Sequence, residues 1–143
     1  MNHFRKIAER LEEQGLDAMM LTGAANRFYA SGFYTPGTDA VALVTRDKAW
    51  FFTDSRYTEA AERHLADAIL GAVGGGRGYS ALIKEVVSAE KIQRMGFEEA
   101  YMTMWEYEHY RKALSCELVS AAQLLWDLRM VKDDWELETM IAA

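Results

Sequence analysis

The side chains that most often catalyse reactions or bind metals do not form a known motif in this chain. His3, His64 and His109 lie far apart in the sequence, whereas zinc sites usually contain close pairs such as H-x-x-x-H or C-x-x-C. Glu106 and His109 stand three residues apart, a spacing that di-metal helical bundles use, but those bundles need a second such pair and further glutamates. We therefore expect a solvated helix face there and no metal site.

The candidates for a nucleophile or a catalytic acid are equally weak. Cys116 is the single cysteine, and no neighbouring residue marks an activating base, so we expect a buried structural thiol. The chain has no G-x-S-x-G motif. Charge runs such as Glu98-Glu99 are typical of solvated surfaces. Residue chemistry alone therefore predicts that this chain lacks a complete active site.

A glycine-rich segment, Gly74 to Gly78, follows a predicted strand and precedes a predicted helix. Phosphate-binding loops occupy such positions, but the segment fits neither G-x-x-x-x-G-K-[ST] nor G-x-G-x-x-G. We interpret it as a mobile loop that could fold over something presented by a partner.

Two clusters combine charged and aromatic side chains around turns. The first covers residues 26–34 and precedes a Pro36-Gly37 turn, and the second covers residues 52–57 between a strand and a helix. We expect Asp54 or Ser55 to cap that helix, with Asp54 also paired to its neighbouring arginine. The residue types favour structural roles in turns and caps. The residues of interest are Asn26, Arg27, Tyr29, Gly32, Asp54, Arg56 and Tyr57. We expect Tyr57 to pack beneath the pair of Asp54 and Arg56.

The elements that must position these clusters alternate between extended and helical patterns. A hairpin of two antiparallel strands is predicted over residues 41–53, and the clearest amphipathic helix over residues 79–87. Strands alternating with helices indicate an α/β sandwich around a mixed sheet. The predicted strands cover residues 17–22, 41–45, 50–53, 69–73 and 92–97.

Three further helices are predicted from residue pairs that start a helix. Thr103 with Glu106 fits a capping box, and Ser120 with Gln123 and Asp133 with Glu136 open the next two. The last of these patterns reaches residue 143 without a glycine, a proline or a basic final turn. We therefore expect the natural protein to continue.

Composition excludes several classes of protein. The 143 residues carry 16 Lys and Arg against 22 Asp and Glu, a net charge of −6, which argues against a nucleic-acid partner because phosphates are bound mainly by clustered cations. No apolar run reaches the length of a membrane span, and the charged N-terminus is not a secretory signal. With one cysteine, no intrachain disulfide can form. We expect a cytoplasmic protein that contacts neither nucleic acid nor membrane.

At the two clusters the sequence resembles the N-terminal domain of the creatinase/prolidase metallopeptidases, the pita-bread family that includes Xaa-Pro dipeptidases and aminopeptidases. Residues 26–33 are similar to the family's N-x-R-Y-x-[ST]-G-F signature, one residue shorter, and residues 52–57 match F-T-D-x-R-Y. Three further pieces follow the family in order: Gly15-Leu16-Asp17-Ala18, Gly96-Phe97-Glu98, and residues 128–133 with Glu136, which resemble the R-x-x-K-[DS]-x-x-E crossover.

The resemblance implies a three-layer α/β/α fold with a ribonuclease-H-like motif and a mixed sheet of five or six strands, in which the strand at residues 41–45 runs antiparallel to its neighbours. Residues 1–130 would form the N-terminal domain. Residues 131–143 would begin the helix that links it to a C-terminal catalytic domain absent from this sequence.

The resemblance also implies where the chemistry lies. The family's ligands for two Mn, Co or Zn ions (two Asp, one His and two Glu) belong to the C-terminal domain, and none maps onto this chain. We therefore expect no cofactor and no catalytic residue in the fragment, which would be inactive alone, and a metallopeptidase activity in the full-length protein.

Partners and substrate follow from the resemblance as well. Such domains typically form homodimers, and the loop after the G-F signature can reach the partner's active-site cleft. By analogy, Phe33, Tyr34 and Asp39 are candidates for shaping a pocket for a short proline-containing peptide with a free α-amine. The full-length protein would hydrolyse the peptide bond that precedes proline.

Two other functions are compatible with the same sequence. The domain could belong to a creatinase-like amidinohydrolase, or it could be a metal-free module that binds peptides or histones. Ordered metal ligands downstream of residue 143 would favour an enzyme, and their loss would favour a binding module.

Overall fold

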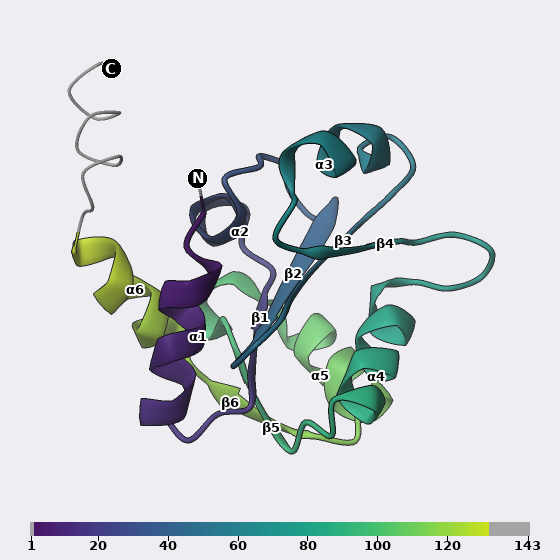
Figure 1. Ribbon diagram of the computed structural model, residues 1–143. Coiled ribbons are helices and arrows are strands. Elements are labelled where there is room, and N and C mark those ends of the chain that lie inside the picture. The colour runs from purple at the N-terminus through teal and green to yellow at the C-terminus, as the bar shows by residue number, and fades with distance from the viewer. Residues whose placement is uncertain (1, 132–143) are drawn as a thin grey trace.

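The computed structural model describes residues 2–131, and its centre is one six-stranded sheet with the strand order β4-β3-β2-β1-β5-β6 (Figure 1). Strand β2 runs antiparallel to both of its neighbours, β1 and β3, and the other three pairs are parallel. The predicted mixed sheet and the orientation of the strand at residues 41–45 are confirmed. The strands are β1 (Ala18–Leu21), β2 (Ala40–Thr45), β3 (Ala49–Thr53), β4 (Ile69–Ala72), β5 (Arg94–Phe97) and β6 (Glu117–Ser120).

The central strands are apolar along their whole length because both faces of the sheet are covered. Successive side chains of a strand point to opposite faces. Met19 and Leu21 accordingly join one core, whereas Ala18 and Met20 join the other. Strands covered on both sides read as continuous hydrophobic runs, and every residue of β1, β2 and β3 is buried.

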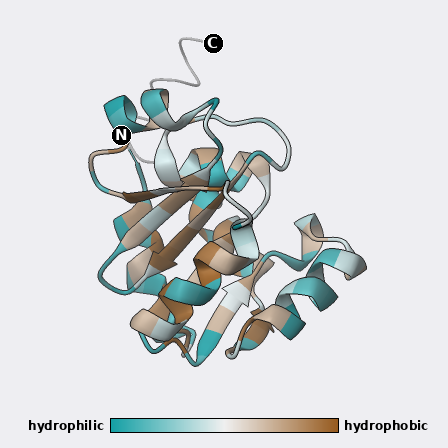
Figure 2. Cartoon of the chain, turned by 90° about the vertical axis from the view of Figure 1, so that its right-hand side faces the viewer, coloured by the Kyte–Doolittle hydropathy of each residue, from teal (hydrophilic) through white to brown (hydrophobic). Residues whose placement is uncertain are grey.

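Helices form the two outer layers. The core on one face takes side chains from α1, α2, α3 and α6, and the core on the other face takes them from α4 and α5. Figure 2 shows the hydrophobic residues gathered on the strands and on the helix sides that face them. The three-layer α/β/α fold is confirmed. The helices are α1 (Phe4–Glu13), α2 (Ala24–Ser31), α3 (Thr58–His64), α4 (Tyr79–Ala89), the 3-10 helix η1 (Glu99–Tyr101), α5 (Met104–Ala113) and α6 (Ala122–Met130).

Local signals mark two helix ends. The Thr103 side chain accepts a bond from the Glu106 N–H while the Glu106 side chain accepts one from the Thr103 N–H, so the predicted capping box is confirmed. Gly32 ends α2 in the left-handed conformation, with φ of 74°, which suits glycine because it has no Cβ.

Two predicted caps are wrong, because other hydrogen bonds, one from a distant residue and one local, replace them. Ser120 ends strand β6, which the sequence analysis missed, and the first N–H of α6 donates instead to the Glu99 carboxylate at 2.7 Å. Helix α3 begins at Thr58 without a side-chain cap, since the Asp54 carboxylate is bound by Arg56. The helix predicted from Asp133 lies outside the described residues.

Candidate functional site

Both clusters singled out from the sequence lie along the border of the sheet that is formed by one set of strand ends. Strands β1, β3, β4, β5 and β6 end at this edge and β2 begins there, and we call it the carboxyl edge. Ligands of open α/β sheets usually bind beyond the carboxyl ends of the strands. A ligand of this sheet would therefore bind at this edge, which holds two arrays of polar side chains that differ in burial.

The buried array is centred on Arg27, whose side chain is fully buried. Its guanidinium donates to the carbonyl oxygens of Thr22 at 2.5 Å, Thr35 at 2.9 Å and Gly37 at 2.8 Å. Burial lowers the pKa of Arg27, and the negative charge of Glu98 opposes that shift. These three hydrogen bonds connect the loop at residues 33–39 to the end of β1.

The buried array extends through Glu98, and the prediction that Glu98 belongs to a solvated charge run is wrong. Glu98 is fully buried, and one of its oxygens accepts the N–H groups of Thr22 at 2.9 Å and Gly23 at 3.1 Å. The other accepts the Asn26 amide at 2.6 Å, and Asn26 in turn accepts from Arg129 at 3.1 Å. Burial raises the pKa of Glu98 despite these donors. Its position directly after a buried strand was the signal that could have identified it.

The exposed array joins Asp39, Asp54, Arg56 and Tyr57. The Arg56 guanidinium lies 2.7 Å from the Asp54 carboxylate and 3.0 Å from that of Asp39, and the Tyr57 hydroxyl donates to Asp39 at 3.3 Å. The predicted pairing of Asp54 with Arg56 is confirmed. The Arg56 side chain remains 63% exposed, so this array is open to solvent and to ligands.

The exposed array has a net charge of −1, from two carboxylates and one guanidinium. The hydrogen bonds between Asp54 and Arg56 lower the pKa of the Asp54 carboxyl group and raise the pKa of the Arg56 guanidinium. Tyr79, at the start of α4, lies in the same field: its burial, together with Asp54 and Asp39, raises its pKa to about 12. The shifts of Asp54, Arg56 and Tyr79 favour their usual charge at neutral pH, and the array can bind a cation or the polar end of a peptide.

The three residues proposed for a substrate pocket occupy different surroundings. Tyr34 is 63% exposed and meets Phe28 edge to face, with ring centroids 6.4 Å apart. Phe33 instead faces inward, against Phe51 and His64. Asp39 belongs to the exposed array. Tyr34 and Asp39 therefore reach the surface, and Phe33 supports their loop from beneath.

Tyr29, also from the first cluster, packs against the N-terminal segment and α6. The Tyr29 ring stacks on the His3 ring with centroids 4.0 Å apart, and its hydroxyl donates to the Leu128 carbonyl at 3.5 Å. Tyr29 therefore connects α2 to the N-terminal segment and to α6.

The described residues offer few groups for catalysis. Across residues 2–131, no three His, Cys, Asp or Glu side chains come together as metal ligands would. His109 stacks on Trp105 and hydrogen-bonds Ser80 at 3.1 Å. Cys116 is half-buried, and burial raises the pKa of its thiol, which disfavours the reactive thiolate.

The glycine-rich segment closes as a tight turn. Gly74 and Arg77 exchange two backbone hydrogen bonds of 3.0 Å, and Gly75 and Gly76 between them have φ of 59° and 82°. Two consecutive positive φ angles are typical of the turn that glycine favours. Arg77 forms an ion pair with Glu85.

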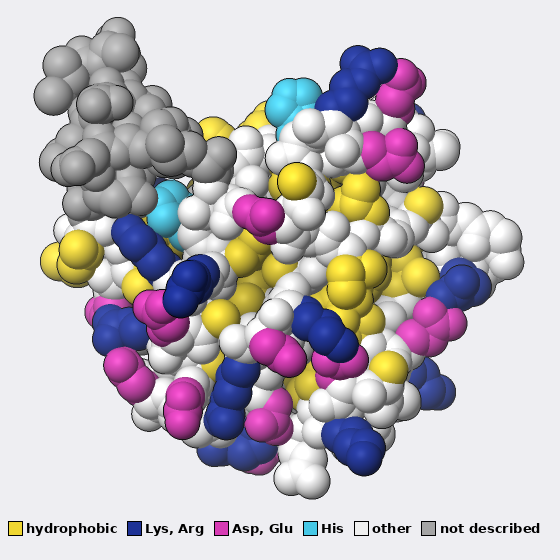
Figure 3. All heavy atoms as spheres, in the orientation of Figure 1, with side chains coloured by type: hydrophobic (Ala, Val, Ile, Leu, Met, Phe, Trp, Pro, Cys, Tyr) yellow, Lys and Arg dark blue, Asp and Glu magenta, His cyan; other side chains and the backbone are white. Residues whose placement is uncertain are grey.

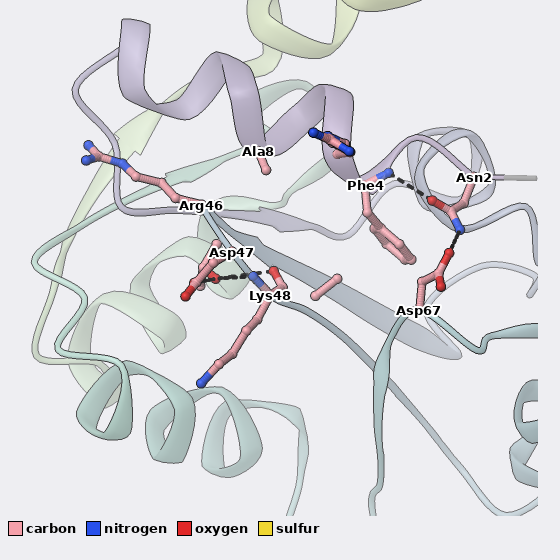
Figure 4. A pocket seen from close by; sticks show the side chains of 10 residues that line it. Asn2, Phe4, Ala8, Arg46, Asp47, Lys48 and Asp67 are labelled. Atoms are coloured by element: carbon pink, nitrogen blue, oxygen red, sulfur yellow. Dashed lines mark hydrogen bonds between the residues drawn. The ribbon is translucent and has the colours of Figure 1, made fainter.

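A separate hollow of about 360 Å³ lies at the opposite edge of the sheet (Figure 4). Phe4, Ala8 and Ala49 contribute its apolar part, and the turn between β2 and β3 forms its rim with Lys48. Of the residues at its rim, Lys48 pairs with Glu90 at 3.1 Å. On the face of the molecule drawn in Figure 3, Lys and Arg side chains are interspersed with Asp and Glu.

The fold and these motifs define the family. A family model described as the Creatinase/Prolidase N-terminal domain matches residues 4–131. The chain therefore belongs to the creatinase/prolidase N-terminal domain family, as its motifs indicated.

Individual relatives agree. An uncharacterized peptidase of Bacillus subtilis, YqhT, is 32% identical over 139 residues, which cover 94% of this chain and 37% of that protein. The structure of a Xaa-Pro dipeptidase from Bacillus anthracis is similar with a TM-score of 0.84 and 27% identity, over 94% of this chain and 37% of that one. This chain thus spans little more than a third of these two relatives.

A third relative has nearly the same extent as this chain. The structure described as the N-terminal domain of cytoplasmic peptidase PepQ from Mycobacterium tuberculosis is similar with a TM-score of 0.76 and 28% identity, over 90% of this chain and all of that one. In residues 2–131 no helix combines the length and apolar character needed to cross a membrane.

Proposed function

We propose that this chain is the non-catalytic N-terminal domain of a cytoplasmic Xaa-Pro peptidase that hydrolyses the peptide bond preceding proline. The observation that carries the proposal is the family match over residues 4–131, supported by the similarity to a Xaa-Pro dipeptidase. Hydrolysis would require the C-terminal domain and its two divalent metal ions (Mn, Co or Zn), which activate water and stabilise the developing negative charge. No step of the reaction is assigned to residues of this chain.

The role proposed for this chain is to form a homodimer and complete the partner's substrate pocket. Tyr34 offers an exposed aromatic ring and Asp39 belongs to an array with a net negative charge. A short peptide with a free α-amine suits such a surface, because its ammonium group is attracted to the carboxylates and its apolar side chain to the ring. Phe33 would hold the loop in place from the core.

The test uses the chain joined to its natural downstream sequence and supplied with Mn²⁺ or Co²⁺. We expect hydrolysis of Xaa-Pro dipeptides or peptides by the full-length protein and none by the 143-residue chain alone. Turnover of creatine would instead support the amidinohydrolase, and peptide binding without turnover would support the binding module. Robust peptidase activity of the fragment alone would contradict the proposal.

The pocket residues are tested in the same full-length enzyme. Tyr34→Ala and Asp39→Asn are each expected to raise KM by roughly tenfold, because each removes one substrate contact. Asp47→Asn is the matched control, since Asp47 is a carboxylate at the opposite edge of the sheet and its loss should leave KM unchanged. If neither pocket variant alters KM or substrate preference, these residues do not belong to the site.

A further inference from the structure

The hydrogen bonds of Glu98 fix the protonation state that the structure represents. All three partners of its carboxylate are donors: the N–H groups of Thr22 and Gly23 and the side-chain amide of Asn26. An ionised carboxylate only accepts hydrogen bonds, whereas a protonated one must also donate. The observed arrangement is therefore that of the ionised form.

The ionised carboxylate in turn determines the orientation of the Asn26 amide. Its Nδ2 donates to Glu98 at 2.6 Å, which leaves Oδ1 to accept from Arg129 at 3.1 Å. Asn26 is itself buried. A buried amide between an acceptor and a donor has only one orientation that satisfies both neighbours.

We propose that Glu98, Asn26 and Arg129 form a proton-sensitive link in which protonation of Glu98 reverses the Asn26 amide and releases Arg129 from the body of the domain. The proton comes from solvent and binds the Glu98 oxygen that faces Asn26. That oxygen then donates, so Asn26 must turn its Oδ1 toward Glu98. Its Nδ2 now faces the guanidinium, which is also a donor, and the hydrogen bond to Arg129 is lost.

The release acts on the last turn of α6. Arg129 lies in that turn, and the Tyr29 hydroxyl makes the other bond from α2 to it, a long one of 3.5 Å to the Leu128 carbonyl. Loss of the shorter, charge-assisted bond is expected to loosen this turn while the start of α6 stays attached through Glu99. The link therefore controls how firmly the last turn of α6 is held against α2.

The charged and titratable groups around Glu98 determine the pH at which the link responds. Arg27 from α2 favours the ionised form, and burial favours the protonated form. Arg129 from α6 acts through Asn26, and the ring of Tyr101 from η1 lies nearby, because a Cβ placed at Gly23 would be 2.9 Å from that ring and 3.1 Å from Glu98. Burial and the Arg27 charge thus oppose each other at one carboxylate.

The first experiment needs no substitution. Nuclear magnetic resonance of the 143-residue chain is recorded as the pH is lowered, together with amide hydrogen exchange corrected for its intrinsic pH dependence. Related N-terminal domains have been solved alone, so the chain is a suitable sample. We expect the Asn26 side-chain amide signals to change, and protection of residues 128–130 to fall roughly tenfold at the same midpoint, while protection of α1 stays constant.

Variants then assign the effect. Glu98→Gln imitates the protonated state, because its amide donates toward Asn26, so the last turn of α6 should exchange about tenfold faster at every pH. Glu117→Gln, at an exposed carboxylate paired with Arg94, is the control and should behave as the wild type. In Arg129→Met the Asn26 transition should persist while the last turn is already loose and insensitive to pH.

Three results would overturn the link. They are protection of α6 that is independent of pH while the Asn26 amide signals change, Glu98→Gln with unchanged protection of α6, and a pH response of α6 that survives unchanged in Arg129→Met. If Glu98→Gln does not fold, the wild-type pH series together with Arg129→Met decides the matter.

Discussion

Two carboxylates hold strands β1 and β5 together, one at the carboxyl edge of the sheet and one at the opposite edge. Each accepts two consecutive backbone N–H groups, but their pKa values shift in opposite directions. At the carboxyl edge, Glu98 follows β5 and accepts the two consecutive N–H groups that follow β1. At the opposite edge, Asp17 precedes β1 and accepts the N–H groups of Gln93 and Arg94 at the start of β5, both at 3.0 Å. The two carboxylates thus reach residues 75 to 77 positions away in the sequence.

The difference between the two carboxylates lies in their surroundings. Asp17 is partly exposed, and the N–H of Arg94 is the main cause that lowers its pKa. Glu98 is fully buried, and desolvation outweighs a similar set of donors and raises its pKa. The same hydrogen-bonding arrangement therefore stabilises the ionised form at the surface, but does not fully compensate for the loss of water in the interior.

The largest expected contrast is in the free energy of unfolding. Glu98→Ala should lower it by about 3–5 kcal/mol, because it leaves buried donors without an acceptor and the Arg27 charge without its counter-charge. Asp17→Ala, the matched variant, should lower it by only about 1 kcal/mol, because water can replace the exposed acceptor. Urea unfolding of both variants measures the difference, and equal losses would show that burial does not distinguish the two carboxylates.

A methyl group added beside Glu98 is expected to have an intermediate effect. A Cβ at Gly23 would lie 2.9 Å from the Tyr101 ring and 3.1 Å from the Glu98 carboxylate, so Gly23→Ala should destabilise the fold by about 1–3 kcal/mol through overpacking. Gly78→Ala is the control, because nothing lies within 4 Å of a Cβ there and its φ is negative. A thermal melt of Gly23→Ala that matched this control would mean that the packing around Glu98 is loose.

The smallest effect is the dependence of stability on pH, which should have opposite signs for the two carboxylates. The lowered pKa of Asp17 means that its contribution is complete above the unfolded value of about 3.9 and is lost as the pH falls through the folded value. The raised pKa of Glu98 means that its contribution is complete below the unfolded value of about 4.3 and is lost as the pH rises through the folded value.

Unfolding free energies measured in urea across this pH range separate the two contributions. Glu98→Gln should remove the decrease with rising pH, and Asp17→Asn should remove the decrease with falling pH. A profile of the Glu98→Gln variant that ran parallel to that of the wild type would show that Glu98 does not change its proton affinity on folding.

Much of the fold followed from local patterns. The hairpin of β2 and β3, the apolar run of β1 and the capping box at Thr103 depend on hydrophobic periodicity and on residues three apart, and all were predicted correctly. Strand β6 was missed because it is short and is the outermost strand of the sheet. It is only partly buried there, so its hydrophobic periodicity is weak.

The candidate site was predicted less completely. The pairing of Asp54 with Arg56 is local and was predicted. The contact of Arg56 with Asp39 depends instead on the antiparallel pairing of β2 with β3. The inward orientation of Phe33 likewise depends on Phe51 and His64, which belong to other elements. Sequence patterns therefore identified the residues of the loop but not which of them reach the surface.

By itself, the sequence determined the alternation of strands and helices, the two-sided core and the family motifs, because each depends on residue types a few positions apart. Only the tertiary structure decided that Glu98 is buried, that Glu99 rather than Ser120 caps α6, and that Asn26 connects to Arg129. Those contacts join residues 23 to 103 positions apart. They exist because the parallel pairing of β1 with β5 and of β5 with β6 brings the ends of distant segments to one edge.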